Sequence, residues 1–158
     1  MATPGSAQVT PERIMQFAWG FVPPLVIEAA IRHRIFDVLD SGPKDIKQVQ
    51  RETGASERGL TAIMNVLVGL NLLAKDDQQH FSLTPESEAF LVSTKPSFQG
   101  GMSRHCSEHL IPKWLHLNEI VATGKPVASV NQETAGSAFF KKFVNDILKV
   151  PPFSAFIS

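Results

Sequence analysis

The sequence predicts a mainly α-helical fold with one small two-stranded β-hairpin, and three observations support this prediction. Residues that cap helices precede several apolar runs. Only residues 72–74 and 80–84 have a β-like composition, and the polar tip 75–79 separates them. Apolar residues recur elsewhere at helical spacing, and in the clearest run five of them share one helix face: Leu60, Ile63, Met64, Leu67 and Leu70.

The N-terminal part is expected to hold two helices after a loose tail at residues 1–9. Thr10-Pro11-Glu12 has the hydroxyl, proline and acid order of a helix start. Pro23-Pro24 is expected to interrupt this first helix, because proline has no N–H to donate. A second helical pattern then runs from Leu25 to Leu39.

Residues 43–92 predict a winged helix-turn-helix. Asp45 and Gln48 have the spacing of a capping box, and Gly54 suits the left-handed position that ends a helix. Ser56 is expected to cap the second helix, which the hairpin follows. Thr84-Pro85-Glu86 repeats the start signal and should open another helix.

The last third of the chain is expected to be helical again. One helical region runs from about residue 102 to 122 with an interruption near Pro112, and a final amphipathic helix is expected at 137–149. The chain therefore divides into a tail, a helical and winged-helix dimerisation domain, a helical extension and a short end: 1–9, 10–92, 93–150 and 151–158.

Composition limits the classes of function. Fifteen basic and fifteen acidic residues give a formal net charge of zero, whereas duplex-binding proteins usually carry a basic excess. There is one cysteine and no secretory signal, and no uncharged apolar run reaches the 18 or so residues that span a bilayer. We therefore expect a cytoplasmic protein that binds neither nucleic acid nor membrane.

Two local patterns have a functional and a structural interpretation. His105, Cys106 and His109 have ligand types that suit zinc, but a tetrahedral site needs four ligands and Cys106 points away from His105 on a helix. We therefore expect no metal site. The helix 57–70 would read DNA in a regulator, yet Glu57 and Arg58 are its only charges, so a scaffold role is favoured.

The first helix carries more bulky apolar groups than one small core can cover. Phe17, Trp19, Phe21 and Val22 lie on more than one side of it. The alternatives are burial in the chain's own core and burial against a second subunit. Phe139, Phe140 and Phe143 of the final helix raise the same question.

Four pieces of the sequence resemble, in order, the N-terminal region of small-molecule O-methyltransferases, which include hydroxyindole, plant phenolic and bacterial polyketide enzymes. The likeness covers roughly residues 11 to 148. Its central piece is Gly54-Ala55-Ser56-Glu57-Arg58-Gly59-Leu60 with Ile63-Met64 and Leu67 after it. The others are Ile35-Phe36-Asp37-Val38-Leu39, Phe81-Ser82-Leu83-Thr84-Pro85, and Trp114-Leu115-His116-Leu117 leading to Thr123-Gly124-Lys125-Pro126.

The resemblance implies an intertwined homodimer, with the first helices and Phe17, Trp19, Phe21 and Val22 at its interface. It also implies that a C-terminal Rossmann-like domain of a full-length relative binds S-adenosylmethionine and supplies a histidine base. This chain has no strand followed by a G-x-G turn, and only eight residues follow Val150. We therefore expect no catalytic and no cofactor-binding residue here, and a chain that stops before the catalytic domain.

The function expected from this resemblance is a dimerisation and substrate-lid region that is inactive alone. His109, Trp114 and His116 are the candidates to line a pocket for a small aromatic or polyketide ligand, with core packing as the alternative for Trp114 and His116. The competing function is a stand-alone winged-helix regulator that binds DNA or a small ligand. An autonomous enzyme is disfavoured, because no Ser-His-Asp set or paired carboxylates occur in a suitable context.

Overall fold

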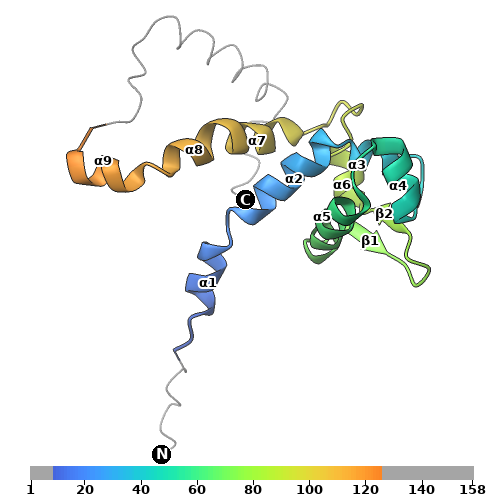
Figure 1. Cartoon of the computed structure of the whole chain (residues 1–158), viewed down its shortest axis with the longest axis horizontal. Coiled ribbons are helices and arrows are strands. Elements are labelled where there is room, and N and C mark those ends of the chain that lie inside the picture. The colour runs from blue at the N-terminus through green and yellow to red at the C-terminus, as the bar shows by residue number, and fades with distance from the viewer. Residues whose placement is uncertain (1–8, 126–158) are drawn as a thin grey trace, which may run out of the picture.

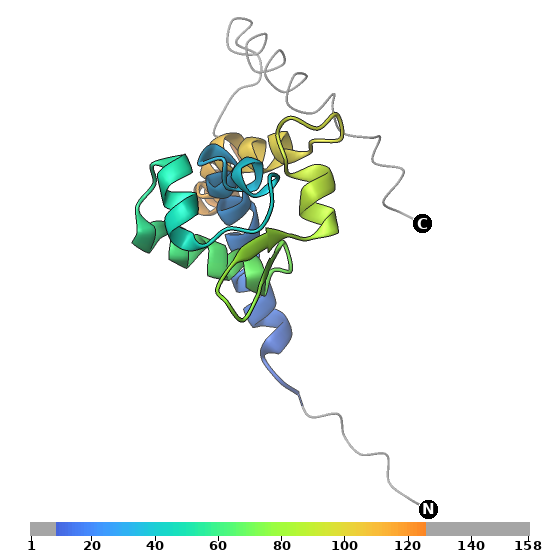
Figure 2. The same ribbon diagram turned by 90° about the vertical axis from the view of Figure 1, so that its right-hand side faces the viewer.

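The computed structural model describes residues 9–125, and the helix expected at 137–149 lies outside them, as do Phe139, Phe140 and Phe143. A small helical body contains the hairpin, α1 projects from it as a stalk, and an arm that begins with α7 projects in another direction (Figure 1). Seen from the side, α1 again extends away from the body (Figure 2). The elements are α1 Glu12–Ala18, α2 Val22–Arg32, α3 Ile35–Leu39, α4 Ile46–Thr53, α5 Glu57–Gly69, β1 Leu73–Lys75, β2 Phe81–Leu83, α6 Pro85–Phe90, α7 Gly100–His105, a π-helix Cys106–Leu110, α8 Ile111–Trp114 and α9 Leu117–Thr123.

The body has one continuous apolar core. Helices α2 to α5, both strands and Val92, two residues after the end of α6, contribute to it. The helix α5 stripe predicted from sequence supplies three of its fully covered side chains, whereas Ile63 is only partly buried. The core residues are Ala30, Ile35, Phe36, Val38, Leu39, Val49, Leu60, Met64, Leu67, Leu73, Phe81 and Val92.

The predicted helix-turn-helix is present, with its caps. Asp45 accepts a hydrogen bond from the Gln48 backbone N–H, and the Gln48 side chain accepts one from the Asp45 N–H, which completes the capping box. Gly54 is left-handed with φ of 71°, and the Ser56 hydroxyl accepts from the Gly59 N–H. The two helix ends are therefore fixed by local chemistry.

The hairpin is confirmed, one residue away from the predicted bounds. Strands β1 and β2 pair antiparallel with Leu73 opposite Leu83 and Lys75 opposite Phe81. An isolated bridge between Lys44 and Phe81 ties β2 to the segment before α4. Thr84 then caps α6 and forms a capping box with Ser87.

Three details of the predicted first helices are wrong. The second predicted helix, Leu25 to Leu39, is divided into α2 and α3 at residues 33–34, where Arg34 is left-handed with φ of 57°. The Thr10 hydroxyl donates to the Glu12 carboxylate and does not cap α1, whose cap position is Pro11. The break between α1 and α2 lies at residues 19–21, and Pro23 and Pro24 stand in the first turn of α2. Proline fits there because the first N–H groups of a helix have no intrahelical acceptor.

The arm, residues 100–123, is irregular around Pro112, as predicted. The Ile111 N–H donates to the Cys106 carbonyl, which widens the helix to a π-turn just before the proline. Pro112 follows at the start of α8, where its missing N–H costs no intrahelical bond. A second break at 115–116 separates α8 from α9.

One stretch is apolar and long enough for a membrane span by length and composition. It is Glu12–Arg32, 21 residues that contain an 18-residue window with a mean hydropathy of 1.5. Residues 19–21 divide it into α1 and α2, and charged groups stand at both of its ends. Core helices pass the same test, so this property alone does not indicate a membrane.

Candidate dimer interface

Helix α1 has no buried residue. Phe17, Trp19 and Phe21 are 70%, 62% and 52% exposed, although they are among the most hydrophobic side chains in the chain. Val22, the fourth predicted interface residue, begins α2 and is half-buried. The described part of the chain therefore leaves the three predicted aromatic groups uncovered.

The apolar groups of α1 lie on two of its faces. Ile14 and Phe17 lie on one face, with Phe21 following four residues later in the break before α2, and we call this row the α1 seam. Met15 and Trp19 lie roughly 150° around the helix from the α1 seam. They line a shallow groove of about 530 Å³ that extends to Pro23. A helix with two apolar faces fits between two neighbours better than against one.

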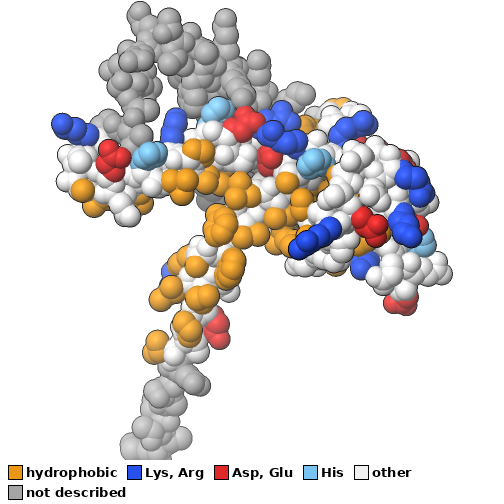
Figure 3. All heavy atoms as spheres, viewed as in Figure 1, with side chains coloured by type: hydrophobic (Ala, Val, Ile, Leu, Met, Phe, Trp, Pro, Cys, Tyr) orange, Lys and Arg blue, Asp and Glu red, His pale blue; other side chains and the backbone are white. Residues whose placement is uncertain are grey.

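The arm carries a second exposed apolar row, which the sequence analysis missed. Leu110, Trp114, Leu117 and Val121 follow one another at spacings of four, three and four residues, and their exposure runs from 36% for Leu110 to 77% for Val121. We call this row the arm seam. Its spacing is that of a helix-packing stripe and was visible in the sequence. Figure 3 shows apolar side chains along α1 and along the arm, meeting near the start of α2.

An ion-pair cluster attaches the arm to α2. Arg32 donates to Glu28 on its own helix at 2.6 Å and to Glu108 of the π-helix at 3.0 Å. The hydrogen bonds to Glu28, and then those to Glu108, raise the pKa of Arg32 above its usual value. Glu28 is nearly buried, so the cluster joins the arm to the body at a defined point.

Close packing fixes the first turn of the arm. A Cβ added to Gly100 would lie 2.3 Å from the Phe98 ring and 2.5 Å from the Ile31 side chain. Only glycine permits α7 to approach α2 this closely. The direction of the arm is thus set by the packing of α7 against α2.

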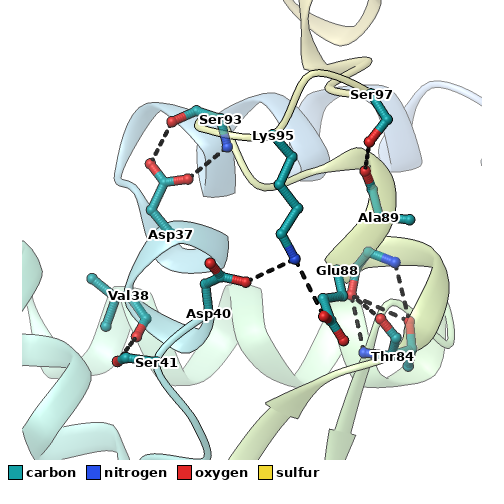
Figure 4. Close-up of polar contacts among 11 residues, drawn as sticks. Asp37, Val38, Asp40, Ser41, Thr84, Glu88, Ala89, Ser93, Lys95 and Ser97 are labelled. Atoms are coloured by element: carbon teal, nitrogen blue, oxygen red, sulfur yellow. Dashed lines mark hydrogen bonds and ion pairs between the residues drawn. The ribbon is translucent and has the colours of Figure 1, made fainter.

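Hydrogen bonds and ion pairs hold the loop between α6 and the arm (Figure 4). The Ser93 backbone N–H and hydroxyl both donate to the Asp37 carboxylate, at 2.7 and 2.9 Å. Lys95 pairs with Asp40 at 3.0 Å and with Glu88 at 3.3 Å. The hydrogen bond to Asp40 raises the pKa of Lys95 above its ordinary 10.5. These contacts tie the loop to α3 and α6.

The three predicted pocket residues do not share one environment. His109 is mostly covered, with its ring centroid 5.4 Å from that of buried His105. Trp114 is 64% exposed on the arm seam, and His116 lies 3.5 Å from Glu119 on the exposed outer arm. One of the three predicted pocket residues is therefore mostly covered, and the other two are more than half exposed.

A different hollow in the body is mostly apolar. It has a volume of about 380 Å³ and lies between α2, α6 and α7. Its lining includes Ile27, Leu72, Phe90 and Leu91, with Glu86, Gln99 and Ser103 as polar groups. Periodicity did not reveal it, because its walls come from segments far apart in the sequence.

The His-Cys cluster does not assemble as a metal site. His105 and His109 lie together, whereas Cys106 is half-buried one residue along the π-helix. Within residues 9–125, no group of three or more His, Cys, Asp or Glu side chains is placed to hold a metal ion.

The sequence family follows from a direct match. A model of the family described as O-methyltransferase dimerisation domain matches residues 15–93, half of the chain. The chain belongs to this family. The dimerisation domain match begins at Met15, within α1, covers the helical body and ends at Ser93, before the arm.

Curated relatives of this dimerisation domain are methyltransferases. The tetracenomycin polyketide synthesis 8-O-methyl transferase TcmO of Streptomyces glaucescens is 26% identical over 123 residues, which are 78% of this chain and 36% of the relative. Acetylserotonin O-methyltransferase of Mus musculus is 29% identical over 117 residues, 71% of this chain and 30% of the relative. The chain thus spans about a third of the length of these curated relatives.

Solved structures share the fold. Human N-acetylserotonin methyltransferase, solved in complex with SAM, superposes with a TM-score of 0.75 at 22% identity, over 93% of this chain and 47% of that one. PigF, solved with SAH, gives a TM-score of 0.71 at 22% identity, over 87% of this chain and 44% of that one. The fold of the dimerisation domain is therefore shared with both structures.

The described residues do not form a cradle for S-adenosylmethionine. Such a site needs a parallel strand that runs through a Gly-rich turn into a helix, whereas the only strands within residues 9–125 are the antiparallel β1 and β2. Gly100-Gly101 opens α7 after a loop, and Phe98 and Ile31 already fill the space beside Gly100. No step of methyl transfer can be assigned to these residues.

Proposed function

We propose that this chain forms a homodimer through α1 and so supplies the dimerisation part of an S-adenosylmethionine-dependent O-methyltransferase. One observation carries the proposal: α1 projects from the body with Phe17, Trp19 and Phe21 each more than half exposed. Membership of the dimerisation family supports it. In this dimer, the exposed apolar side chains of α1 would be buried between two identical copies of the chain.

The energetics favour a covered α1. Burying one large apolar side chain contributes roughly 1.5–3 kcal/mol relative to exposure. Contiguous apolar patches of this kind are uncommon on monomers, and twofold pairing is the most frequent way to cover them. Each copy would supply the same surface, so a single set of residues serves both sides of the interface.

We assign methyl transfer to a full-length enzyme and not to this chain alone. We propose that the arm helps to enclose a small aromatic or polyketide acceptor, with His109, Trp114 and His116 near it, while a separate domain binds the cofactor. The names of the relatives support methyl transfer to oxygen. We also propose a soluble cytoplasmic protein.

Light scattering coupled to size exclusion tests the dimer. The wild type should elute as a dimer, and Trp19→Glu should shift it towards monomer without loss of helicity, because a buried charge opposes association. Val66→Glu is the matched control, since Val66 is an exposed apolar residue of α5 in the body. It should leave the mass unchanged.

Two outcomes would contradict the proposal. One is a wild-type mass near 17.3 kDa at all concentrations, and the other is an equal loss of dimer in both variants. A monomer that binds liposomes of neutral lipid through Glu12–Arg32, and loses this binding in Trp19→Glu, would favour a membrane contact for α1 instead.

A further inference from the structure

We propose that the apolar hollow between α2, α6 and α7 binds a neutral, planar aromatic compound that carries a hydroxyl group. The inference goes beyond the proposed function, because it adds a ligand site in the body. None of the acceptor candidates on the arm, His109, Trp114 and His116, lines this hollow. Its walls all come from one copy of the chain, so the site does not require the proposed homodimer.

The size and lining of the hollow are those of a small-molecule site. Its volume of about 380 Å³ lies near the lower end of the roughly 300–1,000 Å³ range of such sites. Most of its lining is apolar, and a few polar groups stand beside the apolar residues. This combination suits a compound of one or two rings with a single polar group.

The core of the body supports the floor of the hollow. Ile27, Leu72 and Leu91 are partly buried, and each packs against the buried core cluster. Side chains held by close packing on one side keep their positions when the space on the other side is empty. A ligand therefore meets a preformed surface, and preformed sites lose less conformational freedom on binding.

Hydrogen bonds hold the walls of the hollow in place. The Gln99 backbone N–H donates to the Phe90 carbonyl at 2.8 Å, which closes the neck of the loop between α6 and α7. The Ser97 hydroxyl donates to the neighbouring Ala89 carbonyl. The close packing of Gly100 on α2 fixes the α7 side, and Figure 1 shows α7 lying along α2. The α6 and α7 walls are thus fixed relative to each other.

The polar groups of the hollow favour a neutral ligand with a donor. Glu86 is an exposed acid that accepts hydrogen bonds and repels anions, and Ser103 adds a hydroxyl. Within the described residues, the lining includes no lysine or arginine that would attract a carboxylate or phosphate. The apolar lining also opposes a positive charge, because burial of an ion is costly. A hydroxyl that donates to Glu86 meets all of these conditions.

Phe90 makes an aromatic ligand the best fit. Its side chain lines the hollow at the end of α6 and is still 43% exposed. Aromatic rings pair in offset or edge-to-face arrangements that contribute beyond the area they bury. A planar ring in the hollow would therefore cover the exposed Phe90 ring better than an aliphatic chain of the same size.

Fluorescence titration with β-naphthol tests the site, because this probe has two fused rings and one hydroxyl. The full chain should bind it saturably, with a dissociation constant on the order of 100 μM. The anion β-naphthoate has the same rings and should bind at least about fivefold more weakly.

Two acid variants test the selection against an anion. Glu86→Gln should tighten β-naphthoate binding by about threefold and change β-naphthol binding less than that, because the amide oxygen still accepts a hydrogen bond. Glu57→Gln is the matched control, since Glu57 is an exposed acid at the start of α5 and does not line the hollow. It should change neither affinity.

A pair of apolar variants tests the location. Phe90→Ala should weaken β-naphthol binding by about tenfold, because it removes the aromatic wall. Val66→Ala should change the affinity less than twofold, since Val66 lies on α5 and is 40% exposed, much like Phe90. Circular dichroism should show unchanged helicity in both variants, as both positions are exposed.

Three outcomes would overturn the inference, and none of them depends on the mass of the wild type. One is the lack of saturable binding up to about 1 mM β-naphthol. Another is equal binding by Phe90→Ala and wild type, which would place the probe elsewhere, for example in the groove beside Met15 and Trp19. The third is binding only by Trp19→Glu, which would mean that a second copy covers the hollow. Equal binding by Trp19→Glu and wild type is the expected result.

Discussion

The body and the two projecting segments contain similar apolar residues but use them differently. In the body, Phe36 and Leu67 are buried among neighbours from several elements. In α1 and the outer arm, Phe17 and Trp114 are mostly exposed, although both are large aromatic residues like Phe36. The body therefore covers its apolar residues within one chain, whereas α1 and the outer arm leave theirs exposed within residues 9–125, as the proposed dimer requires.

The largest expected effect is in the body. Phe36→Ala should lower the free energy of unfolding by about 3–5 kcal/mol, because it leaves a cavity in a closed core. Phe17→Ala should change it by less than about 0.5 kcal/mol at concentrations where the chain is monomeric. Urea denaturation measures both, and the milder Ile35→Val, expected to cost about 0.5–1.5 kcal/mol, serves if Phe36→Ala does not fold. Equal losses of unfolding free energy in Phe36→Ala and Phe17→Ala would contradict the distinction between the body and α1.

A pair of glycine variants tests how the arm is attached. Gly100→Ala should destabilise the chain by about 1–3 kcal/mol, because the new Cβ would overlap the Phe98 ring and Ile31. Gly69→Ala, in α5 with no atom within 4 Å of the new Cβ, should stabilise it by up to about 1 kcal/mol. Thermal unfolding measures the difference, and a harmless Gly100→Ala would mean that the arm is not packed tightly on α2.

A smaller effect is expected at the hairpin tip. The His80 backbone N–H donates to the Asp76 carboxylate at 2.8 Å and lowers the pKa of Asp76 below 3.8. A depressed pKa stabilises the folded state above the unfolded pKa, and this contribution is lost as the pH falls below 3.8. Asp76→Ala should therefore lower the urea midpoint slightly at neutral pH and less in acid. A difference that grows in acid would contradict this assignment.

No effect at all is expected from the cofactor. Calorimetry with S-adenosylmethionine should give no binding heat, because residues 9–125 form no parallel strand and no open Gly-rich turn. Gel shift at physiological salt should likewise detect no specific DNA binding, since the net charge is zero and Asp76-Asp77 stands at the wing tip. Micromolar cofactor binding would contradict the first expectation, and specific binding near 10⁻⁸ M the second.

The sequence predicted the body well because its signals are local. Capping at Asp45 and Ser56, the left-handed Gly54 and the α5 stripe each depend on residues close in the chain. The break between α1 and α2 was misplaced, because proline in the first turn starts a helix as readily as it ends one.

The candidate surfaces were only partly predictable. The aromatic residues of the first helix were identified from sequence because bulky apolar side chains lie on more than one side of that helix. The arm seam was missed, since its residues have the spacing of ordinary core residues and only the fold shows that nothing in residues 9–125 covers them. The apolar hollow beside Phe90 depends on contacts between distant segments, which periodicity does not report.

Sedimentation equilibrium of the unmodified chain over a wide range of concentrations tests the central claim most directly. The exposed α1 and arm predict a mass of twice 17.3 kDa that falls towards 17.3 kDa on dilution, as a reversible dimer requires. A single species of 17.3 kDa at every concentration would contradict the claim that a second copy covers these helices.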